Sequence, residues 1–167
     1  MATKHCVIRT DLASGVNQYA DLVSLRFYTG AGEVADVDNG VIVQLEGSED
    51  GQREVMKAVA AAAGDDLNEC AIVAGVEVMY DERLRNLEDY YNEAGKAVRG
   101  YVPRSRNLYA FTAEGFVGGN VPAVGGEVGI GEDGKIDAAG TGLGKCEHIE
   151  TVGRYTYYTI RIGKTEL

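Results

Sequence analysis

Closely spaced glycines are the feature that most constrains how this chain can fold. The 167 residues include 23 glycines but only 2 prolines. Many of the glycines stand in short polar groups such as Asp38-Asn39-Gly40 and Glu132-Asp133-Gly134. Such groups are typical of tight turns, whereas flexible linkers are long and of low complexity. The pattern therefore predicts short strands joined by tight turns.

The segments between these turns contain many β-forming residues. Leu22–Thr29 and Val41–Leu45 are rich in β-branched and aromatic side chains, and Arg154–Ile162 also alternates along its length. Arg53–Ala63 fits either a strand or a helix, and we expect its first half to be a strand because its neighbours are strands. Further strands are expected at Ala71–Tyr80 and within Asn107–Ala113.

One segment shows helical periodicity instead. Between Asp81 and Val98, apolar residues recur at spacings of three and four, at Leu84, Leu87, Tyr91, Ala94 and Val98. Asp81 suits an N-cap, and Arg99-Gly100 suits the end of a helix. The pattern predicts one central α-helix.

These elements suggest a mainly β chain with two small β-barrel or sandwich-like lobes around that helix. The expected division is an N-terminal arm (1–20), a first β lobe (21–80), a connecting helix (81–99) and a second β lobe (100–167). An internal duplication is a further hypothesis. It rests on segments that are alike and keep their order in the two halves: 24–29 and 107–112, 38–43 and 124–129, 72–80 and 150–158.

Charge and cysteine content narrow the possible roles. The formal net charge of -10 repels phosphate backbones, so we expect no nucleic-acid partner. No apolar stretch is long enough to span a bilayer or to form a signal peptide, so we expect no membrane partner. The three cysteines, Cys6, Cys70 and Cys146, are isolated and odd in number. Their pattern favours folding in a reducing cytoplasm without disulfides.

Two glycine-rich segments are similar in sequence to phosphate-binding loops but lack other features that such loops require. Residues 129–134 match G-x-G-x-x-G, yet Glu132-Asp133-Gly134 is typical of a hairpin turn, with no helix after it. Residues 140–146 lack the first glycine of a phosphate-binding loop, and Cys146 stands where the magnesium-binding hydroxyl belongs. We therefore expect loops at both places and no cofactor.

Candidate metal and catalytic groups are equally weak. His5 next to Cys6, and Cys146 near His148, are the only neighbouring His and Cys residues, and no C-x-x-C pair exists. In a regular strand, Cys146 and His148 would share one face, but the sequence offers no group to orient a nucleophile. Asp36-Val37-Asp38-Asn39-Gly40 is similar to part of a calcium loop, without the chelating glutamate. We assign no catalytic, metal or cofactor residue, and leave open weak divalent-ion binding at an interface.

Residues 72–101 resemble a family of small structural proteins of tailed bacteriophages, the capsid decoration (cement or auxiliary head) proteins. The matching features are the predicted strand-to-helix junction Gly75–Glu82 and the segment Tyr91–Lys96. The resemblance implies a non-enzymatic virion protein with β-rich lobes. Such a protein is made in the bacterial cytoplasm, binds the outside of the capsid through the major capsid protein and oligomerises, with a trimer expected.

Partner-contacting residues are expected in the N-terminal arm and the central segment: His5, Val7, Arg9, Arg83, Arg85, Tyr90 and Tyr91. Two alternative functions stay open. One is another phage structural component, from the tail, the connector or the base of a head fibre. The other is a small cytoplasmic enzyme or ligand-binding protein, which would show a pocket with converging polar groups.

Overall fold

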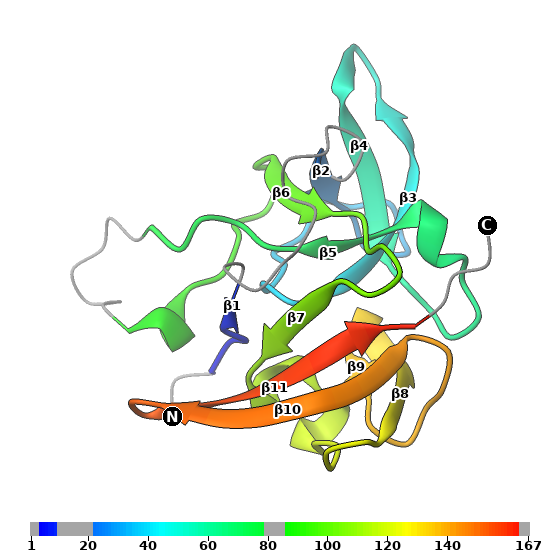
Figure 1. Cartoon of the computed structure of the whole chain (residues 1–167). Coiled ribbons are helices and arrows are strands. Elements are labelled where there is room, and N and C mark those ends of the chain that lie inside the picture. Colours follow the sequence, from blue (N-terminus) through cyan, green and yellow to red (C-terminus); the bar gives the residue numbers. More distant parts are fainter. Residues whose placement is uncertain (1–3, 10–21, 79–85, 164–167) are drawn as a thin grey trace.

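The computed structural model describes residues 4–9, 22–78 and 86–163. It contains two β units that lie against each other (Figure 1). The strands, in chain order, are β1 (Ile8–Arg9), β2 (Leu22–Phe27), β3 (Ile42–Glu49), β4 (Gln52–Ala60), β5 (Cys70–Val73), β6 (Val98–Tyr101), β7 (Leu108–Phe111), β8 (Glu127–Ile130), β9 (Ile136–Asp137), β10 (Gly144–Val152) and β11 (Tyr155–Ile162). Short 3-10 turns join some of them: η3 (Leu67–Glu69), η4 (Leu87–Asp89), η5 (Ala113–Gly115), η6 (Val117–Gly119) and η7 (Glu132–Gly134).

The first unit is a small closed barrel with the strand order β2-β4-β3-β5-β6. Antiparallel pairing between β6 and β2 closes it, and β2 and β4 form its parallel pair. The hairpin of β3 and β4 extends beyond the other barrel strands (Figure 1). Inside the barrel pack Leu25, Val43, Ala58, Ala71 and Val73, all fully buried.

The second unit is a curled six-stranded sheet with the order β1-β7-β11-β10-β8-β9. Its long hairpin, β10–β11, supplies the central strands, and β1 brings the N-terminal segment to one edge by pairing with β7. The N-terminal segment is thus part of this sheet, although it precedes the barrel in sequence.

Strand β5 lies between the two units and is buried on both faces. Alternate residues of a strand point to opposite sides. Accordingly, Ala71 and Val73 face the barrel interior, while Cys70 and Ile72 pack in the core shared with the six-stranded sheet. That shared core also contains Phe111, Phe116, Ile136, Ile160 and Ile162 from the second unit. All four residues of β5 are fully buried, which explains the continuous apolar run of its sequence.

The predicted central α-helix is wrong. Residues 86–98 form η4, an isolated bridge at Asn92, a turn and the first residue of β6, and no α-helix occurs among the residues that the structure describes. Tertiary contacts override the periodicity here. Asn92 is buried and bonds to the barrel, and Gly95 adopts a φ of 77°, which no α-helix contains.

The two units also do not match the expected duplicated lobes. One is a closed barrel and the other an open sheet with a different strand order. The third pair of similar segments has different structures. Residues 72–78 form the end of β5 and the loop after it, whereas 150–158 form the turn between β10 and β11 with the adjoining strand residues.

Most predicted strands are confirmed, with different limits. The first half of 53–63 is a strand as expected, and β4 continues to Ala60, but 71–80 is in a strand only as far as Val73. The strands β6 and β10 were not predicted. The glycine-rich string 129–134 forms the β8–β9 hairpin, in agreement with its assignment as a turn.

Gly134 sets how closely the two units approach. It has a φ of 70°, and a Cβ atom there would overlap the carbonyl oxygen of Ile42 in β3. We expect Gly134→Ala to lower the free energy of unfolding by about 3 kcal/mol, through backbone strain and a backbone overlap that side-chain rotation cannot relieve.

The matched control is Gly153→Ala. Gly153 has a similar φ of 62°, but no atom of the described residues lies within 4 Å of the added methyl group. This variant should lose only about 1 kcal/mol, the cost of a left-handed backbone. Urea unfolding of both variants measures the difference, and equal losses would show that Gly134 does not limit the approach of the units.

Candidate functional site

Three segments far apart in sequence meet at one edge of the molecule. They are the N-terminal segment 4–9, the segment 86–92 and the turn 152–155 between β10 and β11, and we call their common surface the composite face. His5 joins the first two, because its amide donates to the carbonyl oxygen of Glu88 at 2.8 Å. Arg154 joins the last two, through Asn86 Oδ1 at 2.9 Å and Glu88 Oε2 at 3.2 Å.

Backbone hydrogen bonds and side-chain contacts both hold the N-terminal segment against the six-stranded sheet. Val7 pairs with Thr112, donating its amide to the Thr112 hydroxyl at 3.1 Å and accepting the Thr112 amide at the same distance. Arg9 forms an ion pair with Glu150, and its guanidinium lies 5.5 Å from the centre of the Tyr157 ring. Since both partners come from the six-stranded sheet, this segment is held as a strand against the sheet.

A buried polar network attaches the segment 86–92 to the barrel. Asn39, with no exposed surface, donates to the carbonyl oxygen of Gly75 and accepts the Gly75 amide. Asn92 donates to the carbonyl oxygen of Val37 at 2.9 Å and to Asn39 Oδ1 at 3.0 Å. Because an unpaired buried polar group is costly, these bonds specify one position for the segment.

Burial shifts the pKa of two groups beside this network. It raises the pKa of Glu77, whose carboxylate accepts a hydrogen bond from Asn39 that acts in the opposite direction. Burial also raises the pKa of Tyr90, and the nearby negative charge of Glu77 adds to the effect. The Tyr90 hydroxyl donates to Asn92 Oδ1 at 2.9 Å, so the tyrosine belongs to the network.

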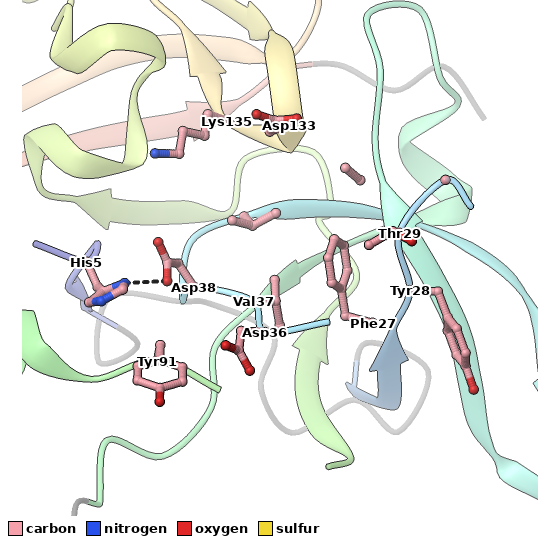
Figure 2. A pocket seen from close by; sticks show the side chains of 13 residues that line it. His5, Phe27, Tyr28, Thr29, Asp36, Val37, Asp38, Tyr91, Asp133 and Lys135 are labelled. Carbon is pink, nitrogen blue, oxygen red and sulfur yellow. Dashed lines mark hydrogen bonds and ion pairs between the residues drawn. The ribbon is translucent and has the colours of Figure 1, made fainter. Parts of the chain in front are cut away.

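Tyr91 and His5 lie together beside the composite face. Their ring centres are 5.4 Å apart, and His5 Nδ1 is 2.6 Å from Asp38 Oδ1. Both rings are partly exposed. They also form one wall of a pocket between the barrel, the N-terminal segment and η7 (Figure 2).

The predicted contact residues differ in where they lie. The structure brings His5, Arg9, Tyr90 and Tyr91 to the two adjacent segments, each of them partly exposed. Val7 is buried under Tyr157 with Ala110, so it supports the face from below. Arg83 and Arg85 lie outside the described residues.

The face also contains residues outside the set of predicted contact residues. Leu87 is 41% exposed and Val152 is 50% exposed, on two segments that Arg154 joins. The Arg154 guanidinium lies over the Tyr155 ring, with its central carbon 5.0 Å from the ring centre. The contacts of Arg154 with Asn86 and Glu88 bring these residues together. They are far apart in sequence, so the grouping is visible only in the structure.

The cysteines are placed as poor nucleophiles. All three are free thiols in the core, and burial raises the pKa of Cys6 and of Cys70 to about 12. A β-bulge between Cys146 and His148 disrupts the predicted alternation, so Cys146 is buried while His148 is exposed. Among the described residues, no group of three or more His, Cys, Asp or Glu side chains could hold a metal ion.

Comparison with known proteins found no matching family model, curated protein or solved structure. Within the described part of the chain, no helix is both long and apolar enough to pass through a bilayer. The functional argument therefore depends on the geometry of the chain itself.

The polar network generates a stability prediction. Asn92→Ala should lower the free energy of unfolding by about 2–3 kcal/mol. It removes the side-chain hydrogen bonds to the Val37 carbonyl and to Asn39 Oδ1, and it leaves the Tyr90 hydroxyl without its acceptor. The control is Asn68→Ala, at an exposed residue whose side chain bonds, among the residues that the structure describes, only to Asp66. The expected change is within about 0.5 kcal/mol. Equal losses in urea unfolding would contradict the assigned role of the network.

Proposed function

We propose that this chain is a structural virion protein that binds the outer surface of a tailed-phage capsid and reinforces contacts between capsomers. The observation that carries the proposal is the composite face. Its three distant segments are joined by the His5–Glu88 backbone bond and by the contacts of Arg154, and a buried asparagine network fixes the segment 86–92 to the barrel. A surface fixed in this way suits a role in which recognition depends on shape and contact area.

The residues of the face are of the kinds that bind protein partners well. Tyrosine and arginine are enriched at the centre of protein interfaces, since each offers a large contact area together with polar groups. Here Tyr91, Tyr155 and Arg154 are grouped with the exposed side chains of Leu87 and Val152. The resemblance of residues 72–101 supplies the phage context, with the correction that residues 86–98 contain no α-helix.

The physical effect of such a protein is thermodynamic. A protein that binds only the mature shell stabilises that shell by mass action, and repeated contacts around a lattice act together through multivalency. The net charge of -10 keeps the chain away from DNA and limits clumping of particles. In this proposal the partner is the major capsid protein, the chain oligomerises, with a trimer expected, and its site of action is the capsid exterior.

Co-sedimentation tests the proposal directly. The chain is mixed with expanded empty shells assembled from the major capsid protein of the same phage or prophage. We expect it to pellet with the shells in hundreds of copies per particle. About a dozen copies would indicate a connector instead, and a chain that never pellets with the shells is not a decoration protein.

A pair of surface variants tests the role of the composite face. Burying the exposed part of Leu87 contributes about 1 kcal/mol, so Leu87→Ser should weaken shell binding about fivefold. Val124 is 62% exposed in the loop before β8, away from the segment 86–92 (Figure 1), and Val124→Ser should bind as the parent chain does. Equal binding of the two variants would place the contact surface elsewhere.

A further inference from the structure

A pocket of about 450 Å³ opens where the barrel, the N-terminal segment and η7 meet (Figure 2). One part of its lining is apolar and comes entirely from the barrel: Phe27, Val37, Val41 and Ala60. Val37 and Val41 are buried in the barrel core. The apolar wall is therefore fixed by the fold and has the size of a small ring or an aliphatic chain.

The remaining lining is largely polar, and three of its residues are acidic. It contains the carboxylates of Asp36, Asp38 and Asp133, the ammonium group of Lys135 and the imidazole of His5. Three carboxylates therefore stand against one ammonium group and one imidazole. The net charge of the whole chain is also negative, at -10, so the field at the pocket favours cations.

The three carboxylates differ in their hydrogen-bond and ion-pair partners within the protein. Asp38 is bonded to His5, and one oxygen of Asp36 accepts the amide of Ala94 at 2.7 Å. Asp133 forms no side-chain hydrogen bond or ion pair with any described residue, and the same is true of Lys135. Figure 2 shows Lys135 extending toward the side of His5 and Asp38, and Asp133 turned away from it. Asp133 and Asp36, which Figure 2 shows on opposite sides of the drawn lining, thus have no cationic partner among the described residues, and Asp133 has no side-chain partner at all there.

We infer that this pocket binds an organic cation with an apolar body. The body lies on Phe27, Val37 and Val41, and the ammonium or guanidinium group faces the carboxylate of Asp133. Hydrogen bonds of such a group to a carboxylate are charge-assisted and strong. The cation is either a free small molecule or a lysine or arginine side chain, two sources with the same chemistry. The pocket shares His5 and Tyr91 with the segments of the composite face, but Asp133 lies outside that face, so cation binding and capsid binding can each fail without the other.

Asp133 and Glu132 provide a matched pair of variants. Both are exposed carboxylates in η7, but only Asp133 lines the pocket. Asp133 has a φ of 54°, a conformation that asparagine tolerates, so Asp133→Asn retains the turn. Asp133→Asn and Glu132→Gln each remove one negative charge from adjacent positions, and a long-range field would feel both losses equally.

The experiment is a titration of the full ¹⁵N-labelled chain with benzamidine, an aromatic cation, followed by amide chemical shifts in physiological salt. We expect saturable shifts that centre on Val37, Val41 and residues 133–135. Asp133→Asn should weaken binding at least threefold, while Glu132→Gln should change it less than 1.5-fold. Amide spectra of the two variants without ligand verify that the fold is retained.

Two further ligands complete the experiment. One distinguishes a protein side chain from a free small molecule, and the other tests whether a positive charge is required. N-acetyl-arginine amide binding more tightly than benzamidine indicates a protein side chain, and the reverse order indicates a free small molecule. Benzoate has the same ring with an anionic group and should not bind. Benzoate binding as well as benzamidine, equal losses in the two variants, or shifts centred outside the pocket would each overturn the inference.

Discussion

Burial of β5 on both of its faces is the constraint on which the rest of the structure depends. Its four residues are fully buried, with Ala71 and Val73 inside the barrel and Cys70 and Ile72 against the six-stranded sheet. A barrel alone would expose the second pair to water, and the sheet alone would lose part of the apolar surface that covers Phe111 and Ile160. The two units therefore stabilise each other through one shared core.

The candidate sites exist only because these units are joined. The composite face combines a segment attached to the barrel, which contains Asn92, with two segments of the six-stranded sheet. The pocket likewise has a barrel wall and a rim that includes Asp133 and Lys135 from the β8–β9 turn. Neither site is complete in one unit, so both functional proposals require the relative position of the units to be fixed.

The sequence predicted those elements whose conformation depends on local residue patterns, and it failed for elements whose conformation depends on distant contacts. β11 was predicted because its alternating Tyr, Thr and Ile residues match a pleated surface, and the turn at Asp133 because its residue types permit a left-handed backbone. The central helix failed because the periodicity of 81–98 is local, whereas Asn92 bonds to residues more than fifty positions away. β10 was missed because its polar residues weaken the strand pattern and a bulge follows Cys146.

The candidate site was predicted in part. His5 and Tyr91 were chosen separately from the arm and the central segment, and the structure brings their rings together. Val7 was chosen with them, but the pairing of the N-terminal segment with β7 turns its side chain into the sheet packing. The link from Arg154 to Glu88 and the pocket charge at Asp133 depend on the tertiary arrangement, so no local pattern could have revealed them.

The central claim is that the barrel and the six-stranded sheet form one cooperative unit through β5. Native-state hydrogen exchange at increasing urea concentration tests it most directly, because it measures the opening free energy at single amides. We expect the amides of Val43 in the barrel and Ile160 in the sheet to converge on the same opening free energy as Ile72. A barrel that opens at a free energy lower by more than about 2 kcal/mol, while the sheet stays protected, would contradict the claim.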